Sequence, residues 1–121
     1  MPWTYHQASG RLERNGTVVI GGYSGIGAGK NNPTMQATPN VGPIPRGEYR
    51  IGAPFTHAHS GVYTMRLTPI NGTITFGRDG FMIHGDNVAH PGLASNGCVI
   101  ERMAVRSQIW SSGDHILKVV Q

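Results

Sequence analysis

FMIHG at residues 81–85 and SNGCVI at residues 95–100 are the two stretches that decide this fold. The apolar run before His84 predicts a buried strand that carries this histidine at its end. Gly97 permits a tight turn in which Cys98, the only cysteine of the chain, is closely approached by a substrate. Cysteine attacks carbonyl groups as a thiolate, and a neighbouring histidine commonly holds that form near neutral pH. The two stretches therefore predict a catalytic pair, Cys98 and His84.

The residues around Cys98 favour this interpretation over its alternative, a buried and unreactive thiol, which is the usual state of a lone cysteine. Backbone N–H groups at the Gly97–Cys98 turn are suited to contact a developing oxyanion. Ser95 supplies a short hydroxyl that hydrogen-bonds nearby backbone, and Asn96 completes the turn. A single cysteine also excludes an intrachain disulfide.

Length and composition predict one domain over residues 1–121, mainly β, with one short helix. The chain has 18 glycines and 8 prolines against few charged residues, which is typical of short strands joined by turns. Strands are expected at 3–6, 10–12, 17–20, 48–51, 62–67, 73–76, 81–84 and 115–120, with a turn at 69–72 and a helix at 101–110. Residues 21–40 are rich in Gly, Asn, Pro and Ser and predict a long surface loop.

The net charge of +4 is thinly spread. It is compatible with nucleic acid, with an anionic envelope surface, or with no specific partner. No apolar run approaches the ~20 residues that span a bilayer, so no membrane insertion is expected. The N-terminus also lacks the pattern of a cleavable signal peptide.

Two other site types are weakly indicated. The Gly25–Lys30 segment fails the phosphate-binding loop pattern because residue 24 is Ser and residue 31 is Asn. Zinc is the stronger rival, since His57, His59, His90, His84 and Cys98 are ligand types that zinc prefers, but their spacing matches no zinc motif. We therefore expect no metal and no cofactor.

The order of these motifs resembles the L,D-transpeptidase (YkuD-type) catalytic domain, in which a histidine–glycine strand end precedes a Ser-x-Gly-Cys segment. Further similarity lies in WTY at 3–5, YSG at 23–25, GPIPRGEY at 42–49 and GRDGFMIHG at 77–85. These segments resemble the branch that includes type VI secretion L,D-transpeptidase effectors. The resemblance implies a β-sandwich or open barrel, with the Cys98 groove partly covered by the 21–40 loop.

The resemblance also implies a reaction on peptidoglycan tetrapeptide stems, at the bond between diaminopimelate and the terminal D-alanine. Cys98 would form a thioester with the diaminopimelyl carbonyl, and His84 would protonate the departing D-alanine. Water would then give L,D-carboxypeptidase activity, a free D-amino acid would give exchange, and a neighbouring stem amine would give a cross-link. The sequence leaves these outcomes open.

The chain departs from the commoner family pattern at two places. Asn96 stands where a histidine usually precedes the Gly-Cys pair, and Val99 to Arg102 replaces a segment with an earlier arginine. A backbone carbonyl or Asn96 is therefore expected to orient His84, and Arg106 joins the arginines considered for a substrate carboxylate. The other candidate substrate-binding residues are Arg78, Gly85, Asp86, Arg102 and Tyr23.

The same resemblance implies an antibacterial effector, made in the bacterial cytoplasm and delivered to the periplasm of a target cell. Expected partners are peptidoglycan stems, D-amino acid acceptors and a cognate immunity protein, with no nucleic acid. Three alternatives remain: a housekeeping or phage cell-wall enzyme of the same chemistry, a non-catalytic wall-binding module, and a cysteine peptidase acting on ordinary peptides.

Overall fold

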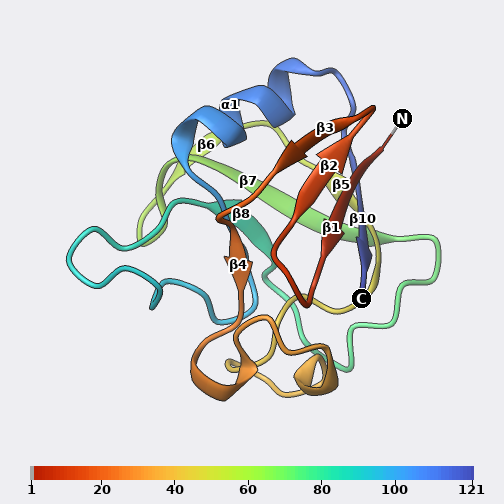
Figure 1. Ribbon diagram of the computed structural model, residues 1–121, viewed down its shortest axis with the longest axis vertical. Helices are drawn as coiled ribbons and strands as arrows, with labels where there is room; N and C mark the ends of the chain where they lie inside the picture. The colour runs from red at the N-terminus through yellow and green to blue at the C-terminus, as the bar shows by residue number, and fades with distance from the viewer. Residues whose placement is uncertain (1) are drawn as a thin grey trace.

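The computed structural model describes residues 2–121. Over these residues ten strands form one open mixed sheet, in the order β3-β2-β1-β10-β5-β7-β8-β9-β4, with β6 paired to β7 (Figure 1). The elements are β1 (Trp3–His6), β2 (Leu12–Arg14), β3 (Thr17–Val19), β4 (Tyr23–Ser24), the 3-10 helices η1 (Gly27–Gly29) and η2 (Pro33–Met35), β5 (Gly47–Ile51), β6 (Phe55–His57), β7 (Gly61–Ile70), β8 (Met82–His84), β9 (Val99–Ile100), α1 (Met103–Ser111) and β10 (Ile116–Val120). The predicted class, mainly β with one short α-helix, is confirmed.

In the central strands every second side chain is buried and contributes to the hydrophobic core. In β10, Leu117 and Val119 are buried while Lys118 between them is exposed, and β5 repeats this pattern with Tyr49 and Ile51. Strand β10 pairs parallel with β1 and antiparallel with β5, so these apolar faces line up on one side of the sheet. The period of two in the sequence therefore sets which face packs inward.

Helix α1 covers this core at one end of the molecule (Figure 1). Its buried residues Val105 and Ile109 pack into the main apolar cluster. The indole N–H of Trp3 donates to Ser112 Oγ at 3.0 Å, which ties the C-terminal end of α1 to β1. The helix begins after Arg102, slightly later than its predicted start.

Strands β8 and β9 run parallel as neighbours, with Ile83 opposite Val99 and His84 opposite Ile100. Cys98 comes directly before β9, so the pairing brings it beside β8. This arrangement is why two stretches separated in sequence contribute to one site.

Two predicted elements between residues 61 and 80 are wrong. Strand β7 runs straight through Pro69 to Ile70, because Pro69 pairs with Tyr49 and the turn begins only at Asn71. The predicted strand at 73–76 is absent from the described chain. Thr73 instead uses its hydroxyl to accept the Glu48 N–H, and Phe76 has a φ of +57°, which no strand adopts.

The predicted loop at 21–40 contains β4 and both 3-10 helices, so it is more ordered than its composition suggested. Strand β4 pairs with β9, which places the start of this segment under the Cys98 region. Most of the segment lies at the end of the molecule opposite α1 (Figure 1).

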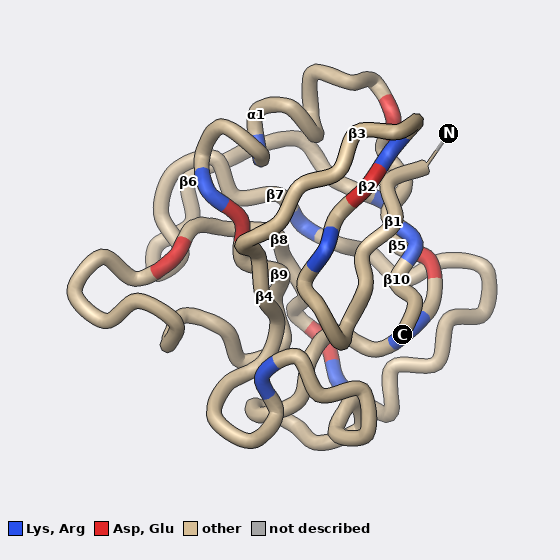
Figure 2. Tube along the Cα trace, viewed as in Figure 1, with Lys and Arg blue, Asp and Glu red and all other residues tan. Residues whose placement is uncertain are grey.

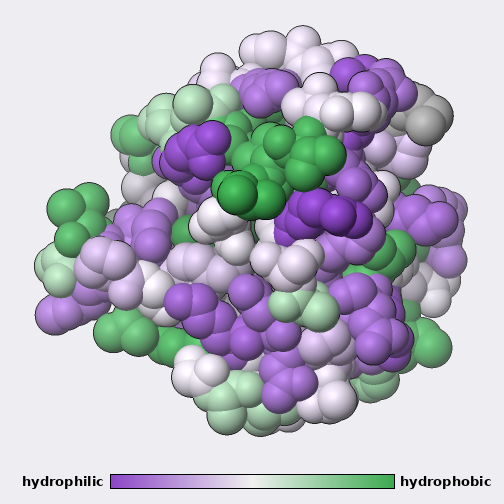
Figure 3. Space-filling view, viewed as in Figure 1, coloured by the Kyte–Doolittle hydropathy of each residue, from purple (hydrophilic) through white to green (hydrophobic). Residues whose placement is uncertain are grey.

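Charges are distributed over many elements rather than gathered into one patch (Figure 2). The face shown in Figure 3 is mostly hydrophilic, with an apolar patch over β3, where Val18 and Ile20 are exposed. Among residues 2–121 no helix has the length and apolar character needed to cross a bilayer.

Candidate functional site

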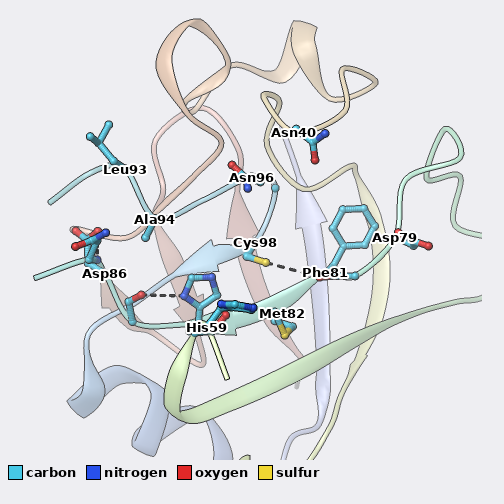
Figure 4. Close-up of a pocket in the computed structure, with 16 residues that line it drawn as sticks. Asn40, His59, Asp79, Phe81, Met82, Asp86, Leu93, Ala94, Asn96 and Cys98 are labelled. Atoms are coloured by element: carbon cyan, nitrogen blue, oxygen red, sulfur yellow. Dashed lines mark hydrogen bonds between the residues drawn. The ribbon is translucent and has the colours of Figure 1, made fainter. Parts of the chain in front are cut away.

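A cavity of about 650 Å³ opens beside the end of β8 (Figure 4). Both residues of the predicted pair, Cys98 and His84, line it. Asp86 and Leu93 lie on one side of Cys98, and Phe81 and Asp79 lie on the other (Figure 4). The lining residues are Asn40, His59, Ser60, Asp79, Gly80, Phe81, Met82, His84, Gly85, Asp86, Asn87, Leu93, Ala94, Asn96, Gly97 and Cys98.

Cys98 is partly exposed, and its thiol donates to the Gly80 carbonyl over 3.8 Å (Figure 4). Burial raises the pKa of the Cys98 thiol, while a hydrogen bond from the Met82 N–H and the charge of Arg78 act to lower it. The net direction is upward. The resting cysteine is thus a neutral thiol, which differs from the expected thiolate held near neutral pH.

His84 is buried, with 6% of its surface exposed. Its Nδ1 lies 2.8 Å from the Gly85 carbonyl oxygen, and because a carbonyl only accepts, Nδ1 carries the hydrogen. Burial lowers the pKa of His84, and the charges of Arg106 and His57 lower it further, against the hydrogen bond to Gly85 and the charge of Asp86. The imidazole is therefore neutral with Nε2 unprotonated. Of the two expected orienting groups, a backbone carbonyl and Asn96, it is the backbone carbonyl of Gly85 that contacts the ring.

Ser95 is fully buried and holds the turn that presents Cys98. Its hydroxyl donates to the Cys98 carbonyl at 2.6 Å and accepts the N–H groups of Gly97 at 3.1 Å and Gly25 at 2.9 Å. Gly97 has a φ of +127°, which favours glycine. Since the Gly97 N–H is already bound to Ser95, it is not free to contact an oxyanion.

Arg78 lies next to the cavity, and its guanidinium is occupied. Its Nη1 and Nη2 groups donate to the carbonyls of Gln36, Pro43 and Gly42, and more weakly to Asn96 at 3.4 Å. Because the N–H groups of Nη1 and Nη2 are all engaged, Arg78 has no pair of N–H donors left to bind a carboxylate through two hydrogen bonds. Arg78 thus fixes the 36–43 segment against Asn96 and adds positive charge near Cys98, and the expectation that it binds a substrate carboxylate is not supported.

Tyr23 and Asp86 form one structural unit at the cavity edge. The Tyr23 hydroxyl donates to Asp86 Oδ1 at 2.6 Å and accepts the Ala94 N–H at 3.0 Å. Asp86 also accepts the N–H of Gly92 at 3.1 Å, which closes the 86–92 loop. Burial and the hydrogen bond to Asp86 raise the pKa of Tyr23 to about 12. Asp86 and Ala94 line the cavity, and Tyr23 supports them from behind.

Some of the remaining candidates line the cavity and others do not. Gly85 lines the cavity and accepts from His84. Arg102 does not line it, because it points toward the Ile20 carbonyl at 3.4 Å as the N-terminal cap of α1. Arg106 is buried under Gly85, where an added Cβ would lie 2.8 Å from its Nη2. The 21–40 loop contributes only Asn40 to the lining.

His59, Ser60 and Asp79 line the cavity although the sequence did not single them out as catalytic or substrate-binding residues. His59 and Ser60 come from the turn between β6 and β7. The only available signal was the His57-x-His59 pattern. Within residues 2–121, no group of three or more His, Cys, Asp or Glu side chains is arranged to hold a metal ion.

In a comparison with known families, a model described as the Tlde1 domain matches residues 18–120. The match runs from β3 to β10 and so includes every residue that lines the cavity. Comparison with curated proteins and with solved structures found no match. Because the family model covers most of the chain, the protein belongs to the Tlde1 domain family, a family of type VI secretion effectors.

Proposed function

We propose that this protein is a cysteine acyl-transfer enzyme that acts on peptidoglycan tetrapeptide stems, at the bond between diaminopimelate and the terminal D-alanine. The observation that carries the proposal is that Cys98 and His84 line one cavity, with His84 Nδ1–H fixed on Gly85 and Nε2 unprotonated. Membership in an effector family and the motif resemblance to L,D-transpeptidases support the substrate class.

The first half-reaction starts from a neutral pair. His84 Nε2 accepts the thiol proton as Cys98 Sγ bonds to the diaminopimelyl carbonyl carbon. The Cys98 N–H is the backbone donor that we assign to the oxyanion, because the Gly97 N–H is bound to Ser95. Protonated His84 then passes its proton to the D-alanine nitrogen, the C–N bond breaks, and a thioester on Cys98 remains.

The second half-reaction consumes the thioester. Water, or the amine of a D-amino acid, loses a proton to His84 Nε2 and bonds to the thioester carbonyl, and the C–S bond breaks to release Cys98, which regains the proton. Water gives the tripeptide, whereas the amine gives an exchanged tetrapeptide. Either product depletes the unmodified tetrapeptide stems, which is the proposed basis of toxicity in a target periplasm, and the expected immunity partner would act by blocking the cavity.

The test is to incubate the purified protein with disaccharide tetrapeptide muropeptides, with and without D-methionine, and to identify products by mass spectrometry. Loss or exchange of one alanine is expected with the wild type and not with Cys98→Ala. A wall-binding module is the competing function. It would bind the tetrapeptide equally well in both proteins and release no alanine.

A further inference from the structure

Strand β7 contains an irregularity near its start, at Val62 and Tyr63. Tyr63 has a φ of +55°, a left-handed conformation that is strained for an aromatic residue. The pairing of β6 with β7 shifts register between Phe55 and His57, opposite this point. Such a bulge turns the strand and re-aims the residues beyond it, and bulges are common beside active sites.

Arg106 holds this bulge from helix α1. Its Nη1 donates to the Val62 carbonyl at 2.8 Å and to the Tyr63 carbonyl at 3.2 Å, while its Nε donates to the Glu101 carbonyl at 3.0 Å. Only 6% of the Arg106 surface is exposed. One buried guanidinium therefore joins the start of β7 to the segment that follows β9.

The turn that this bulge carries forms part of the cavity wall. His59 and Ser60 line the cavity, and their N–H groups both donate to His57 Nδ1 at 3.1 Å. The hydrogen bonds to His57 fix the turn internally. Its position against the cavity therefore depends on the direction in which the bulge turns the strand.

Arg106 also touches the other side of the site. Its Nη2 packs so closely against Gly85 that an added Cβ there would lie 2.8 Å away. Gly85 is the residue whose carbonyl accepts the His84 Nδ1–H. The same guanidinium thus contacts both the support of His84 and the support of His59.

We propose that Arg106 is the positioning residue of this site: it holds the β6–β7 turn as one wall of the Cys98 cavity and fixes Gly85 beside His84. This role rests on the proposed function. It replaces the expectation that Arg106 binds a substrate carboxylate, since Nε and Nη1 are engaged with backbone carbonyls and Arg106 does not line the cavity.

The charges that face His84 agree with the geometry. Besides burial, which has the largest effect, Arg106 and His57 lower the pKa of His84, and Asp86 raises it. Arg106 consequently favours the unprotonated imidazole that accepts the thiol proton. A neutral side chain at this position would remove that contribution and leave those of His57 and Asp86.

The experiment compares Arg106→Gln, Arg106→Lys and the exposed control Arg50→Gln in the full chain. The proton NMR titration of His84, identified by its loss in His84→Gln, gives the midpoint, and amide hydrogen exchange reports on residues 57–63. Arg106→Gln should raise the His84 midpoint and speed exchange at 57–63 at least tenfold. Arg106→Lys should keep the midpoint near wild type and still speed exchange, because an ammonium lacks the planar fork.

Tyr63→Gly guards against a folding defect, because glycine adopts the bulge without strain. The Tyr63→Gly/Arg106→Gln protein should recover folding that Arg106→Gln loses, yet keep the raised His84 midpoint. An unchanged midpoint with unchanged exchange in Arg106→Gln would overturn the proposal, as would failure of both proteins to fold. Neither readout uses catalysis, so a wild type that releases no alanine would contradict only the proposed function.

Discussion

The Ser95 hydroxyl donates to the carbonyl of Cys98 at 2.6 Å while it accepts two backbone N–H groups, so a single buried side chain holds the turn that carries Cys98. The three groups that it satisfies belong to Gly25, Gly97 and Cys98. Residues 86–98 contain little regular secondary structure, so this hydroxyl satisfies backbone groups that sheet hydrogen bonds satisfy elsewhere.

Replacing Ser95 by alanine should therefore damage both stability and catalysis. It leaves buried backbone groups unpaired, which costs about 2–4 kcal/mol of unfolding free energy in total. The Cys98 turn also loosens, so D-alanine release should fall at least tenfold at a temperature where the variant is folded. Denaturant unfolding and muropeptide turnover measure the two effects.

Ser112→Ala is the matched control. Ser112 also accepts two N–H groups, from Trp3 and Asp114, and donates to the Ile109 carbonyl, but it lies outside the cavity lining. It should lower stability and leave turnover per folded molecule unchanged. Equal losses of turnover in both variants would contradict a specific role for Ser95.

The alkylation of Cys98 should follow a raised thiol pKa. Burial keeps the thiol protonated at neutral pH, so the rate with iodoacetamide should rise with pH to a midpoint above that of a free cysteine, about 8.5. His84→Gln should move this midpoint little, because His84 is neutral over the same range. A midpoint well below that of free cysteine, lost in His84→Gln, would indicate a thiolate–imidazolium pair instead.

Tyr23→Phe should loosen the cavity edge without removing a contact of Cys98 or His84. The variant deprives the Ala94 N–H of its acceptor and Asp86 of its strongest donor, so stability should fall by about 1–2 kcal/mol. Amide exchange at Gly92 and Ala94 should quicken, and KM should rise more than kcat falls. The control is Tyr5→Phe, which removes a buried hydroxyl that has no partner among residues 2–121. It should leave stability unchanged or slightly higher, and a matching loss in both variants would refute the role of Tyr23.

Glu101 should make the fold less stable as pH rises. Burial raises the pKa of its carboxyl from 4.5 to about 8, and Oε2 has no partner among the described residues. The folded state then binds the proton more tightly than the unfolded state, so stability is greatest below about 4.5 and is lost as pH rises toward about 8. The slope reaches about 1.4 kcal/mol per pH unit.

Glu101→Gln isolates this effect, because the other carboxylates remain in both proteins. The difference in unfolding free energy between wild type and variant should shift in favour of the variant across this pH range. A difference that stays constant from pH 5 to pH 8 would show that Glu101 is ionised in the folded protein.

Strands such as β1, β5 and β10 could be predicted because their alternation records burial directly in the local sequence. Cys98 and His84 could be predicted as candidates for one site for a similar reason, since each residue lies in a recognisable local sequence pattern. By contrast, β4 and β9 have two residues each and form only through pairing, β4 with β9 and β9 also with β8. No local sequence pattern predicts so short a strand.

The roles of the arginines could not be predicted, because they depend on contacts distant in sequence. Arg78 and Arg106 bind carbonyls that lie dozens of residues away, and nothing beside either residue marks these partners. The bulge at Tyr63 was equally hidden, because a left-handed conformation is rarely assigned to tyrosine.

In the proposed mechanism, Cys98 carries the diaminopimelyl group as a thioester. The most direct measurement is mass spectrometry of the intact protein, quenched with acid within seconds of mixing with disaccharide tetrapeptide. The expected result is a mass increase equal to the disaccharide tripeptide acyl group, located on the peptide that contains Cys98, removed by hydroxylamine and absent in Cys98→Ala. Release of D-alanine by the wild type without any such adduct, and undiminished in Cys98→Ala, would contradict it.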